Sequence, residues 1–444
     1  MVYAALVSAQ HKPVFKNLRY EDDFSYLAGD TNGNWYTKMK FQPLSKDKKT
    51  YVSFGGDIRY QYFNIQNEQW GDVPKDNDGY LFSRLLLHAD FRRGKNFRAF
   101  VQLQSSMVNG KPVTSPLDED PLEVHQAFAE VSSGNKILSF RLGRQEFSYG
   151  SQRLISVREG PNNRQSFDAA KIIFSKKNFL LETFFSHFVK AKKGLFNDGF
   201  NKDTKFWGAY LVKNKVPVFK NIDLYYFGLW KRQVSFDDGS GREIRHSIGS
   251  RLWGGDARFK YDMEAVYQLG KFGTKNIRAW TASMNAAYKL TGVPTHPEFG
   301  LKAEFISGDA HYSDDKLQTF NPLFPRGGYF GLASIIGPAN LADLHPSLAF
   351  QLTKKITLET DYDIFWRYSK NDGIYTPGVS LIYTGKNNPY NAIGQQLTAD
   401  LIYTPNPFLY FRGEFTWFDS GKYLKAAGSG KDIVFWGITS QIRF

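Results

Sequence analysis

The sequence of 444 residues contains no cysteine and no long hydrophobic run. The absence of cysteine excludes disulfide scaffolds, thiolate metal sites and cysteine nucleophiles, although it does not reveal the compartment, because an oxidising space only permits disulfides. The longest stretch without charge, Gly327–Ala342, is interrupted by glycine and proline. A membrane-spanning helix needs roughly 18 consecutive apolar residues, so a helical membrane protein is excluded.

Long basic segments are also missing, although the net charge is +14. The basic runs are short and spread along the chain, and none forms a sustained basic helix or tail: Lys46–Lys49, Arg92–Arg93, Lys176–Lys177 and Lys192–Lys193. A nucleic-acid partner is therefore not expected. Aromatic residues make up 16% of the chain, which is too much ring surface for a disordered protein.

Alternation of apolar and polar residues is the dominant pattern. In the segment 52–62, apolar Phe54, Ile58 and Tyr60 alternate with Asp57 and Arg59. The same period of two returns at 81–93, 257–269 and 356–367. This period is typical of strands with one apolar and one wet face.

The connections between these strands alternate between short and long. Short polar turns at 93–95, 133–135, 176–178 and 405–407 are separated by long Gly/Pro/Asn/Asp-rich connections. The long ones are 64–79, 107–121, 147–165, 191–202, 308–344 and 370–394. The pattern predicts an all-β fold: a transmembrane antiparallel up-and-down β-barrel of about 18 strands with a polar lumen, both chain ends lying on the short-turn side.

Aromatic residues gather near the predicted strand ends, as in the girdles of outer-membrane barrels. The groups are Tyr60, Tyr62 and Phe63; Trp207 and Tyr210; Tyr225, Tyr226 and Trp230; Trp417 and Phe418; and Trp436. The alternating last strand ends on Phe444, which is similar to the outer-membrane assembly signal.

Several motifs together resemble the alginate-export family of outer-membrane porins. They are Arg19–Leu27, Ser53–Tyr60, Arg141–Gly150, Arg153–Ile155, Asn163–Ala169 and Phe320–Pro325. The resemblance implies a monomeric 18-stranded barrel that carries an anionic polysaccharide through an arginine-rich constriction. It also implies that the constriction includes Arg59, Arg84, Arg144 and Arg164, with Arg412 as a weaker match. The alginate exporter has a large periplasmic plug loop, but only Thr404–Pro407 stands at the corresponding turn, so that gate is missing or rebuilt elsewhere.

Strand parity supports a charged lumen independently of the resemblance. Arg59, Arg84, Arg367 and Arg412 fall on the polar face, and a barrel of this size encloses an aqueous channel. Arginine is always charged and binds carboxylates through two donors, so these residues and Arg144 and Arg164 are predicted to select anions. The alternative is that they pair with the inward carboxylates and only brace the wall.

The predicted organisation has three parts. Residues 1–10 resemble the remnant of a secretory signal peptide, although the charged start of such a signal is missing. Residues 11–50 form a periplasmic N-terminal segment, and residues 51–444 form the barrel. The expected location is the outer membrane with both termini periplasmic, and the expected partners are an anionic oligo- or polysaccharide, outer-membrane lipid and periplasmic export proteins.

The sequence contains no complete motif for catalysis or for metal or cofactor binding. Asp118–Asp120 offers three adjacent carboxylates that could bind Ca²⁺, but such a loop cluster is more often solvated. No cofactor, metal or enzymatic activity is therefore expected. The sequence predicts passive passage of anionic, alginate-like oligo- or polysaccharide. The alternatives are a general or uptake porin for small anionic nutrients and, remotely, an outer-membrane enzyme.

Overall fold

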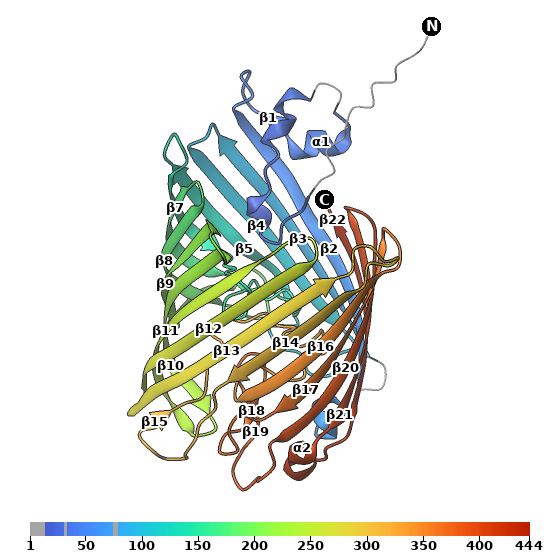
Figure 1. Cartoon of the computed structure of the whole chain (residues 1–444). Helices are drawn as coiled ribbons and strands as arrows, with labels where there is room; N and C mark the ends of the chain where they lie inside the picture. The colour runs from blue at the N-terminus through green and yellow to red at the C-terminus, as the bar shows by residue number, and fades with distance from the viewer. Residues whose placement is uncertain (1–13, 31–32, 74–78) are drawn as a thin grey trace.

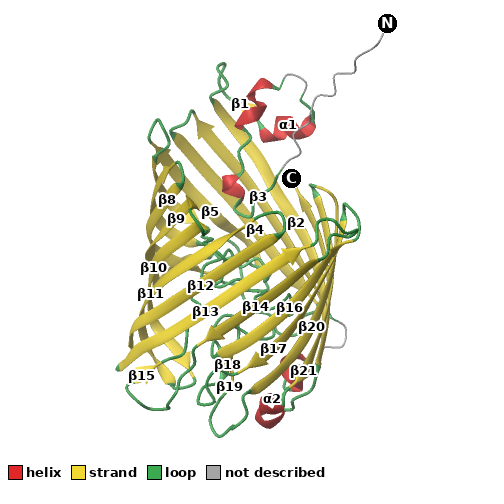
Figure 2. Cartoon of the chain, viewed as in Figure 1, coloured by secondary structure: helices red, strands yellow, loops and turns green. Residues whose placement is uncertain are grey.

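The computed structural model describes residues 14–30, 33–73 and 79–444. Within these residues, 18 antiparallel strands pair in chain order and close into a barrel, which confirms the predicted fold (Figures 1 and 2). The strands of the ring are β2 (Thr50–Gln66), β3 (Tyr80–Arg93), β4 (Phe97–Asn109), β5 (Asp120–Ser132), β6 (Leu138–Gln145), β7 (Phe167–Lys176), β8 (Phe179–Lys190), β9 (Gly199–Val216), β10 (Lys220–Phe236), β11 (Gly239–Gly255), β12 (Phe259–Phe272), β13 (Lys275–Lys289), β14 (Glu298–Ile306), β16 (Leu341–Gln351), β17 (Ile356–Trp366), β20 (Ala392–Asn406), β21 (Leu409–Ser420) and β22 (Ile433–Arg443).

The barrel closes between its first and last strands. β2 pairs with β22 from Asp57 opposite Arg443 to Gln66 opposite Val434. Closure leaves no sheet edge with unpaired main-chain groups, which is the condition for strands to cross a lipid bilayer.

Short elements lie before the barrel and within its connections. Those before the barrel are η1 (Arg19–Glu21), η2 (Ser25–Gly29), α1 (Trp35–Lys40) and β1 (Gln42–Pro43). Those within connections are η3 (Glu68–Gly71), β15 (Lys316–Leu317), β18 (Ile374–Tyr375), β19 (Leu381–Tyr383) and α2 (Lys422–Ala427). None of the helices in the described residues is long and apolar enough to cross a membrane.

The two ends of the barrel differ. Figure 1 shows the C-terminus at one end with the short turns, and α2, β15, β18 and β19 at the other. We call these the short-turn end and the long-loop end. Two connections at the long-loop end, 237–238 and 273–274, are nevertheless two-residue hairpins. In the second of them Gly273 has a φ of 54°, a left-handed conformation that tight hairpins need.

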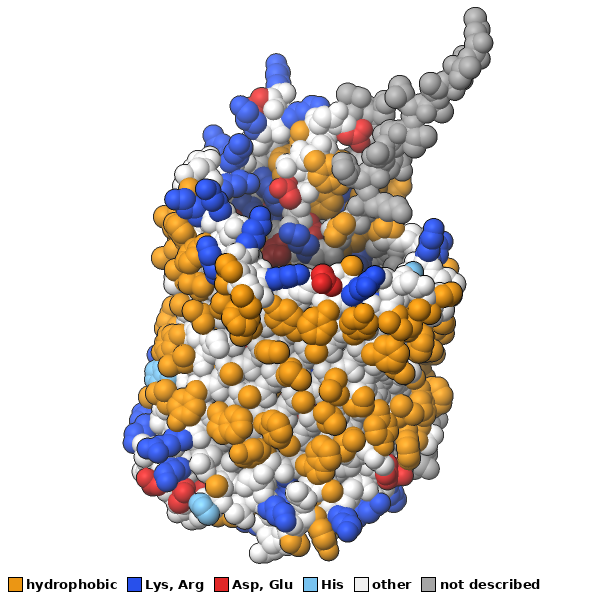
Figure 3. Space-filling view, in the orientation of Figure 1, with side chains coloured by type: hydrophobic (Ala, Val, Ile, Leu, Met, Phe, Trp, Pro, Cys, Tyr) orange, Lys and Arg blue, Asp and Glu red, His pale blue; other side chains and the backbone are white. Residues whose placement is uncertain are grey.

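The barrel wall has an apolar outside and a polar inside, as the alternation predicts. On β2 the side chains of Phe54 and Tyr60 are exposed, whereas Asp57 and Arg59 are buried on the inner side. On the face drawn in Figure 3, hydrophobic side chains form a broad band across the barrel, with charged side chains above and below it. Such a band is what the lipid-facing surface of a transmembrane barrel requires.

Only some of the rings predicted to form the aromatic girdle lie on the outer face of the barrel. Tyr60, Tyr62 and Trp436 are exposed on the outer face, but Tyr210 and Tyr225 are only 4% and 5% exposed. Phe63 and Phe418 are also buried. The inward rings pack against loops that enter the lumen, so they form an apolar core inside the barrel rather than a contact with lipid.

The N-terminal segment docks at the short-turn end. Tyr20 is buried there, with its ring centroid 5.4 Å from that of Phe128 and 4.4 Å from the Arg141 guanidinium carbon. Its hydroxyl donates a hydrogen bond of 3.1 Å to the main-chain carbonyl of Glu146. The segment therefore reaches the wall of the lumen. The predicted signal remnant, residues 1–10, lies outside the described residues.

Candidate functional site: the lumen and its arginines

Two long connections enter the barrel and narrow it. We call residues 146–166, between β6 and β7, the first lumen loop, and residues 307–340, between β14 and β16, the second lumen loop. They are bound to each other, since the Ser156 amide donates to the Phe324 carbonyl at 3.0 Å and the Phe324 amide donates to Leu154 at 2.8 Å. Phe324 also packs against Phe206 of the wall, at 5.1 Å between ring centroids.

Glu159 of the first lumen loop is the meeting point of three of the predicted arginines. Its carboxylate lies 2.5 Å from Arg84, 3.3 Å from Arg59 and 3.3 Å from Arg164. Arg164 also contacts Glu146 at 3.0 Å. Burial by itself would raise the pKa of Glu159, but the three guanidinium groups lower it below its ordinary value. Arg59, Arg84 and Arg164 are thus brought together, and each has a carboxylate partner.

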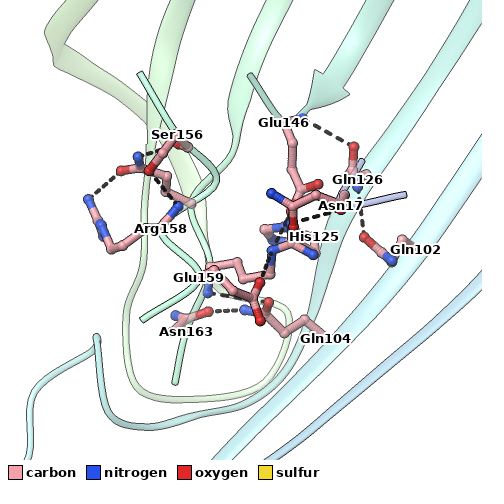
Figure 4. A network of polar contacts seen from close by, with 12 residues as sticks. Asn17, Gln102, Gln104, His125, Gln126, Glu146, Ser156, Arg158, Glu159 and Asn163 are labelled. Carbon is pink, nitrogen blue, oxygen red and sulfur yellow. Dashed lines mark hydrogen bonds and ion pairs between the residues drawn. The ribbon is translucent and has the colours of Figure 1, made fainter. Parts of the chain in front are cut away.

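Main-chain contacts fix the same loop in place. Arg59 donates to the carbonyls of Glu159 (2.7 Å) and Pro161 (3.0 Å). Arg164 donates to the carbonyl of Asn17, at 3.1 Å, which links the loop to the N-terminal segment. Figure 4 shows Asn17, His125, Glu146 and Glu159 converging in this network.

Arg144 and Arg367 lie away from this cluster. Arg144 binds both carboxylate oxygens of Asp168, at 2.9 and 3.3 Å, across the β6–β7 pair. Arg367 follows β17 and donates to the carbonyls of Lys370, Asp372, Asn388 and Tyr390, while its guanidinium carbon lies 4.0 Å from the Tyr423 ring. Its contacts hold the connection 367–391.

Arg412 lines open space but is also paired. It binds both oxygens of Asp400, at 2.6 and 2.8 Å, and contacts Glu414. Two cavities meet beside it, of about 240 and 540 Å³, and both are lined by Arg326 and Leu332 of the second lumen loop.

The two cavities differ in charge. The smaller is lined by four arginines, Arg59, Arg326, Arg412 and Arg443, and by one carboxylate, that of Glu159. The larger is lined by five carboxylates from β14, β17 and β20 and by four basic side chains: Glu298, Glu359, Asp361, Asp363 and Asp400, with Lys302, Arg326, His345 and Arg412. An anion entering the lumen therefore meets a positive surface in the smaller cavity and a mixed one in the larger.

Comparison with known proteins gives the family. The family model described as alginate export matches residues 50–432, which is most of the chain. The chain belongs to the alginate export family. No curated protein matches.

The fold of this alginate export family member is similar to that of solved Pseudomonas porins. A BenF-like porin from Pseudomonas fluorescens Pf-5 has 9% identity and a TM-score of 0.58, with 88% of this chain and 98% of that one covered. OccK2 (OpdF) from Pseudomonas aeruginosa in complex with glucuronate has 9% identity and a TM-score of 0.55, with 89% and 98% covered. OpdK from Pseudomonas aeruginosa with vanillate has 9% identity and a TM-score of 0.57, with 88% and 98% covered. At such identity the likeness shows the fold alone. Family and fold together make this protein an outer-membrane β-barrel of the porin type.

Among the arginines that line the two cavities, the two that the prediction left out have no acidic partner. Among the described residues, neither Arg326 nor Arg443 forms an ion pair. Arg326 is exposed to both cavities, and within the described residues its guanidinium group donates only to the Tyr329 carbonyl, at 3.3 Å. Arg443 donates to Gln441 at 2.9 Å and lies 5.7 Å from the Tyr410 ring centroid. Parity marks Arg443 as inward, whereas Arg326 could be suspected only from its place beside the Phe320–Pro325 motif.

The turn that corresponds to the exporter's plug loop is short in this alginate export family member. The β20–β21 connection, Pro407–Phe408, has only two residues. The N-terminal segment lies at the same end, and its Leu18, Tyr20 and Glu21 line a third cavity of about 340 Å³. The basic side chains of that cavity are all paired: Arg92 and Arg98 with Asp90, Arg141 with Glu130, and Lys171 with Glu182.

The three carboxylates weighed for Ca²⁺ do not act together. Asp118 binds Lys111 at 2.6 Å and accepts from the amide and hydroxyl of Ser115. Asp120 accepts from Asn163 at 3.0 Å, and Glu119 lies 3.8 Å from Lys193. Each therefore has a partner of its own.

Proposed function

We propose that this protein is a passive outer-membrane channel for anionic, alginate-like oligo- or polysaccharide. The observation that carries the proposal is the pair of arginines without acidic partners, Arg326 and Arg443, beside the arginine-lined cavity. A guanidinium group without a carboxylate partner keeps its donors available for the carboxylate of a passing solute. Rings of such groups are the usual filter of anion channels.

The six arginines predicted from the sequence have two different roles in this proposal. Arg59 and Arg412 line the cavity and add to its positive potential, although each shares its charge with an acid. Arg84, Arg144, Arg164 and Arg367 bind acids or carbonyls and hold the connections that set the width of the lumen. In this account, Arg326 and Arg443 attract the solute, and the buried arginines keep the passage in shape.

The proposed orientation places the short-turn end in the periplasm, with both chain ends there. Short periplasmic turns and longer outer loops are the rule in bacterial outer-membrane barrels. The proposed assembly is a monomer that receives its solute from periplasmic export proteins at this end.

An uptake porin for small anionic nutrients is the second candidate. It is favoured by the two lumen loops, which leave cavities of about 240 and 540 Å³ rather than a wide passage. Two proteins of similar fold were solved with small carboxylates, glucuronate and vanillate. Both candidates use the same arginines and differ in the length of solute that passes.

Ion selectivity in planar bilayers tests the proposal. Under a KCl gradient we expect a reversal potential whose sign indicates that chloride passes more readily than potassium. The double substitution of Arg326→Gln and Arg443→Gln should shift the reversal potential toward zero or reverse its sign. Arg232→Gln is the matched control, because Arg232 lies at the exposed end of β10 with its side chain 68% exposed. A wild-type channel without anion preference, or a double variant indistinguishable from wild type, would remove the mechanism.

Solute length separates the two candidates. Liposome swelling with uronate oligomers of increasing length, compared with neutral oligomers of the same length, measures which solutes pass. Passage of long uronate chains supports the polysaccharide channel. Passage of only mono- and disaccharide acids supports the uptake porin.

A further inference from the structure

Three carboxylates from separate connections meet at the long-loop end of the barrel. Asp238 lies in the β10–β11 turn, and Asp309 and Asp314 lie in the second lumen loop. Oxygen atoms of all three lie within 4.8 Å of one another. The cluster shares no lining residue with the arginine-lined cavity.

Asp309 is the unusual member of this cluster. Its side chain is almost fully buried, at 1% exposure, and among the described residues neither carboxylate oxygen has a hydrogen-bond partner. Burial, followed by the neighbouring Asp238, Asp372 and Asp314, raises the pKa of Asp309 to about 8. A buried carboxylate is expensive unless it is paired or binds a metal ion, so the missing partner points to a ligand.

The surrounding contacts hold the other oxygens in place. Asp238 accepts from the Ser313 amide at 2.8 Å and pairs with Lys275, and Asp314 accepts from the Lys316 amide at 2.8 Å. When all three carboxylates are ionised, they and the one ammonium carry an excess of two negative charges. A divalent cation would neutralise that excess.

Residues outside the cluster fix the main chain around Asp309. The buried Asp372 accepts from the Asp309 amide at 2.8 Å and from the Thr319 hydroxyl at 2.6 Å. On the other side, Asp237 accepts from the hydroxyl groups of Tyr312 (2.7 Å) and Thr384 (2.6 Å). The connection 367–391 thus holds Asp309 in position. An acid in a loose surface loop would have no such contacts.

Two other clusters in the described residues are better compensated. In the cluster of His345, Asp361 and Asp363, the imidazole ring of His345 contacts Asp363 and lies 3.6 Å from Asp361, so both acids face a ring nitrogen that can donate. In the cluster of Asp120, Glu123 and Asp198, Glu123 accepts from the amides of Asn197 and Asp198. Among the acids of the three clusters in the described residues, Asp309 has neither oxygen hydrogen-bonded, whereas Asp120, Asp361 and Asp363 each have a single oxygen without a partner.

We propose that Asp238, Asp309 and Asp314 bind a hard divalent cation of the Ca²⁺ or Mg²⁺ class, which joins the β10–β11 turn to the second lumen loop. Carboxylate oxygens are the ligands these ions prefer, and water completes the coordination. The second lumen loop also carries Phe324 and Arg326, so the cation would stabilise the loop that narrows the passage. The proposal does not depend on which solute the channel carries.

Calcium titration of the full-length protein in detergent tests the site. After treatment with a chelator, isothermal titration with CaCl₂ should show binding in the wild type. Asp309→Asn should abolish one site, and Asp314→Asn should weaken it by at least about tenfold. Asp256→Asn, in the β11–β12 turn at the opposite end, is the matched control and should bind as the wild type does.

Proteolysis and folding checks make the result decisive. Ca²⁺ should slow cleavage between residues 309 and 319 in the wild type but not in Asp309→Asn. Folding of each variant is confirmed by its heat-modifiable migration on SDS gels. If Asp309→Asn does not fold, Asp314→Asn, at a half-exposed position, replaces it as the test of the site. No Ca²⁺ or Mg²⁺ binding to the wild type up to about 10 mM, above the range of weak extracellular sites, would overturn the proposal. Equal binding by the wild type and both variants would do the same.

Discussion

The guanidinium of Arg19 donates a hydrogen bond of 2.9 Å to the main-chain oxygen of Phe444, so a residue ahead of the barrel binds the end of its last strand. A second donor of Arg19 reaches the Gly56 carbonyl of β2 at 3.0 Å. β2 and β22 form the closing pair of the barrel. Arg19 therefore bridges the seam where the barrel closes, and Asp22, 3.0 Å away, holds the guanidinium in position.

Arg19→Ala should weaken this seam. The substitution removes two hydrogen bonds from a buried charged donor and leaves Asp22 with the Lys16 amide but without its arginine partner, at an expected cost of about 2–3 kcal/mol. We expect a lower unfolding temperature on SDS gels of heated samples. Arg93→Ala, an exposed arginine at the same end, should leave the unfolding temperature unchanged. An Arg19→Ala protein as heat-resistant as wild type would show that the segment adds nothing to closure.

Docking of the N-terminal segment should depend on pH through Lys40. Burial, with a further contribution from Arg19, lowers the pKa of Lys40 to about 7, and its Nζ donates to the Phe54 carbonyl at 2.8 Å. Of the charged groups near it, Arg19 opposes the ammonium form and Asp22 favours it. Because the docked state prefers the neutral amine, docking should become tighter as pH rises from about 7 toward the ordinary value of 10.5.

Limited proteolysis of the N-terminal segment at pH 6 and pH 9 measures this effect. Cleavage should be faster at pH 6, where Lys40 is charged in both states and the cost of burying it is greatest. Lys40→Met should remove the difference, whereas Lys38→Met, an exposed neighbour on the same helix, should keep it. Equal cleavage of the wild type at both pH values would contradict the assignment.

The barrel could be predicted from the sequence because each strand carries its own signal. Period two along β2 and β12 follows directly from one face meeting lipid and the other water, and it needs no knowledge of distant residues. The inward aromatic rings could not be predicted in the same way. Tyr210 looks like a girdle residue because the ring that covers it, Tyr149 at 4.8 Å between ring centroids, comes from the first lumen loop, a distant part of the chain.

The candidate site could be predicted only in part for the same reason, because its contacts also join distant parts of the chain. Parity correctly placed Arg59 and Arg84 on the inner face, but it could not tell that Glu159, in a loop about 75 residues beyond Arg84, would lie between them. Arg326 belongs to a loop without alternation, so no local pattern marks it as open to the cavity. The role of the predicted arginines in selectivity stays a prediction.

Arg367→Met should destabilise a loop without changing ion selectivity. Arg367 is 2% exposed and donates to four main-chain carbonyls, and it lines neither of the two cavities beside Arg412. Losing these donors should cost about 3 kcal/mol or more and expose the connection 367–391 to protease. Arg232→Met is the surface control. A changed reversal potential in Arg367→Met, with the connection still protected, would assign this residue to the filter instead.

Glu159→Gln should make the channel more anion-selective. Glutamine keeps the shape of the side chain but removes the charge that Arg59, Arg84 and Arg164 share, so the adjoining cavity gains positive potential. The first lumen loop keeps its main-chain bonds to Arg59, so it should stay in the lumen with larger fluctuations in current.

The measurement is the reversal potential under a KCl gradient, recorded together with current noise. Glu119→Gln is the control, because Glu119 loses the same charge in a connection that lines neither cavity. Because the arginines lower the pKa of Glu159, its charge is retained above its ordinary pKa of 4.5 and is lost only as pH falls below that value. The contribution of Glu159 to selectivity should therefore stay constant between about pH 5 and pH 8. An unchanged reversal potential in Glu159→Gln would mean that solute does not pass through the arginine-lined cavity, since a unit change in charge at its wall must alter the potential there.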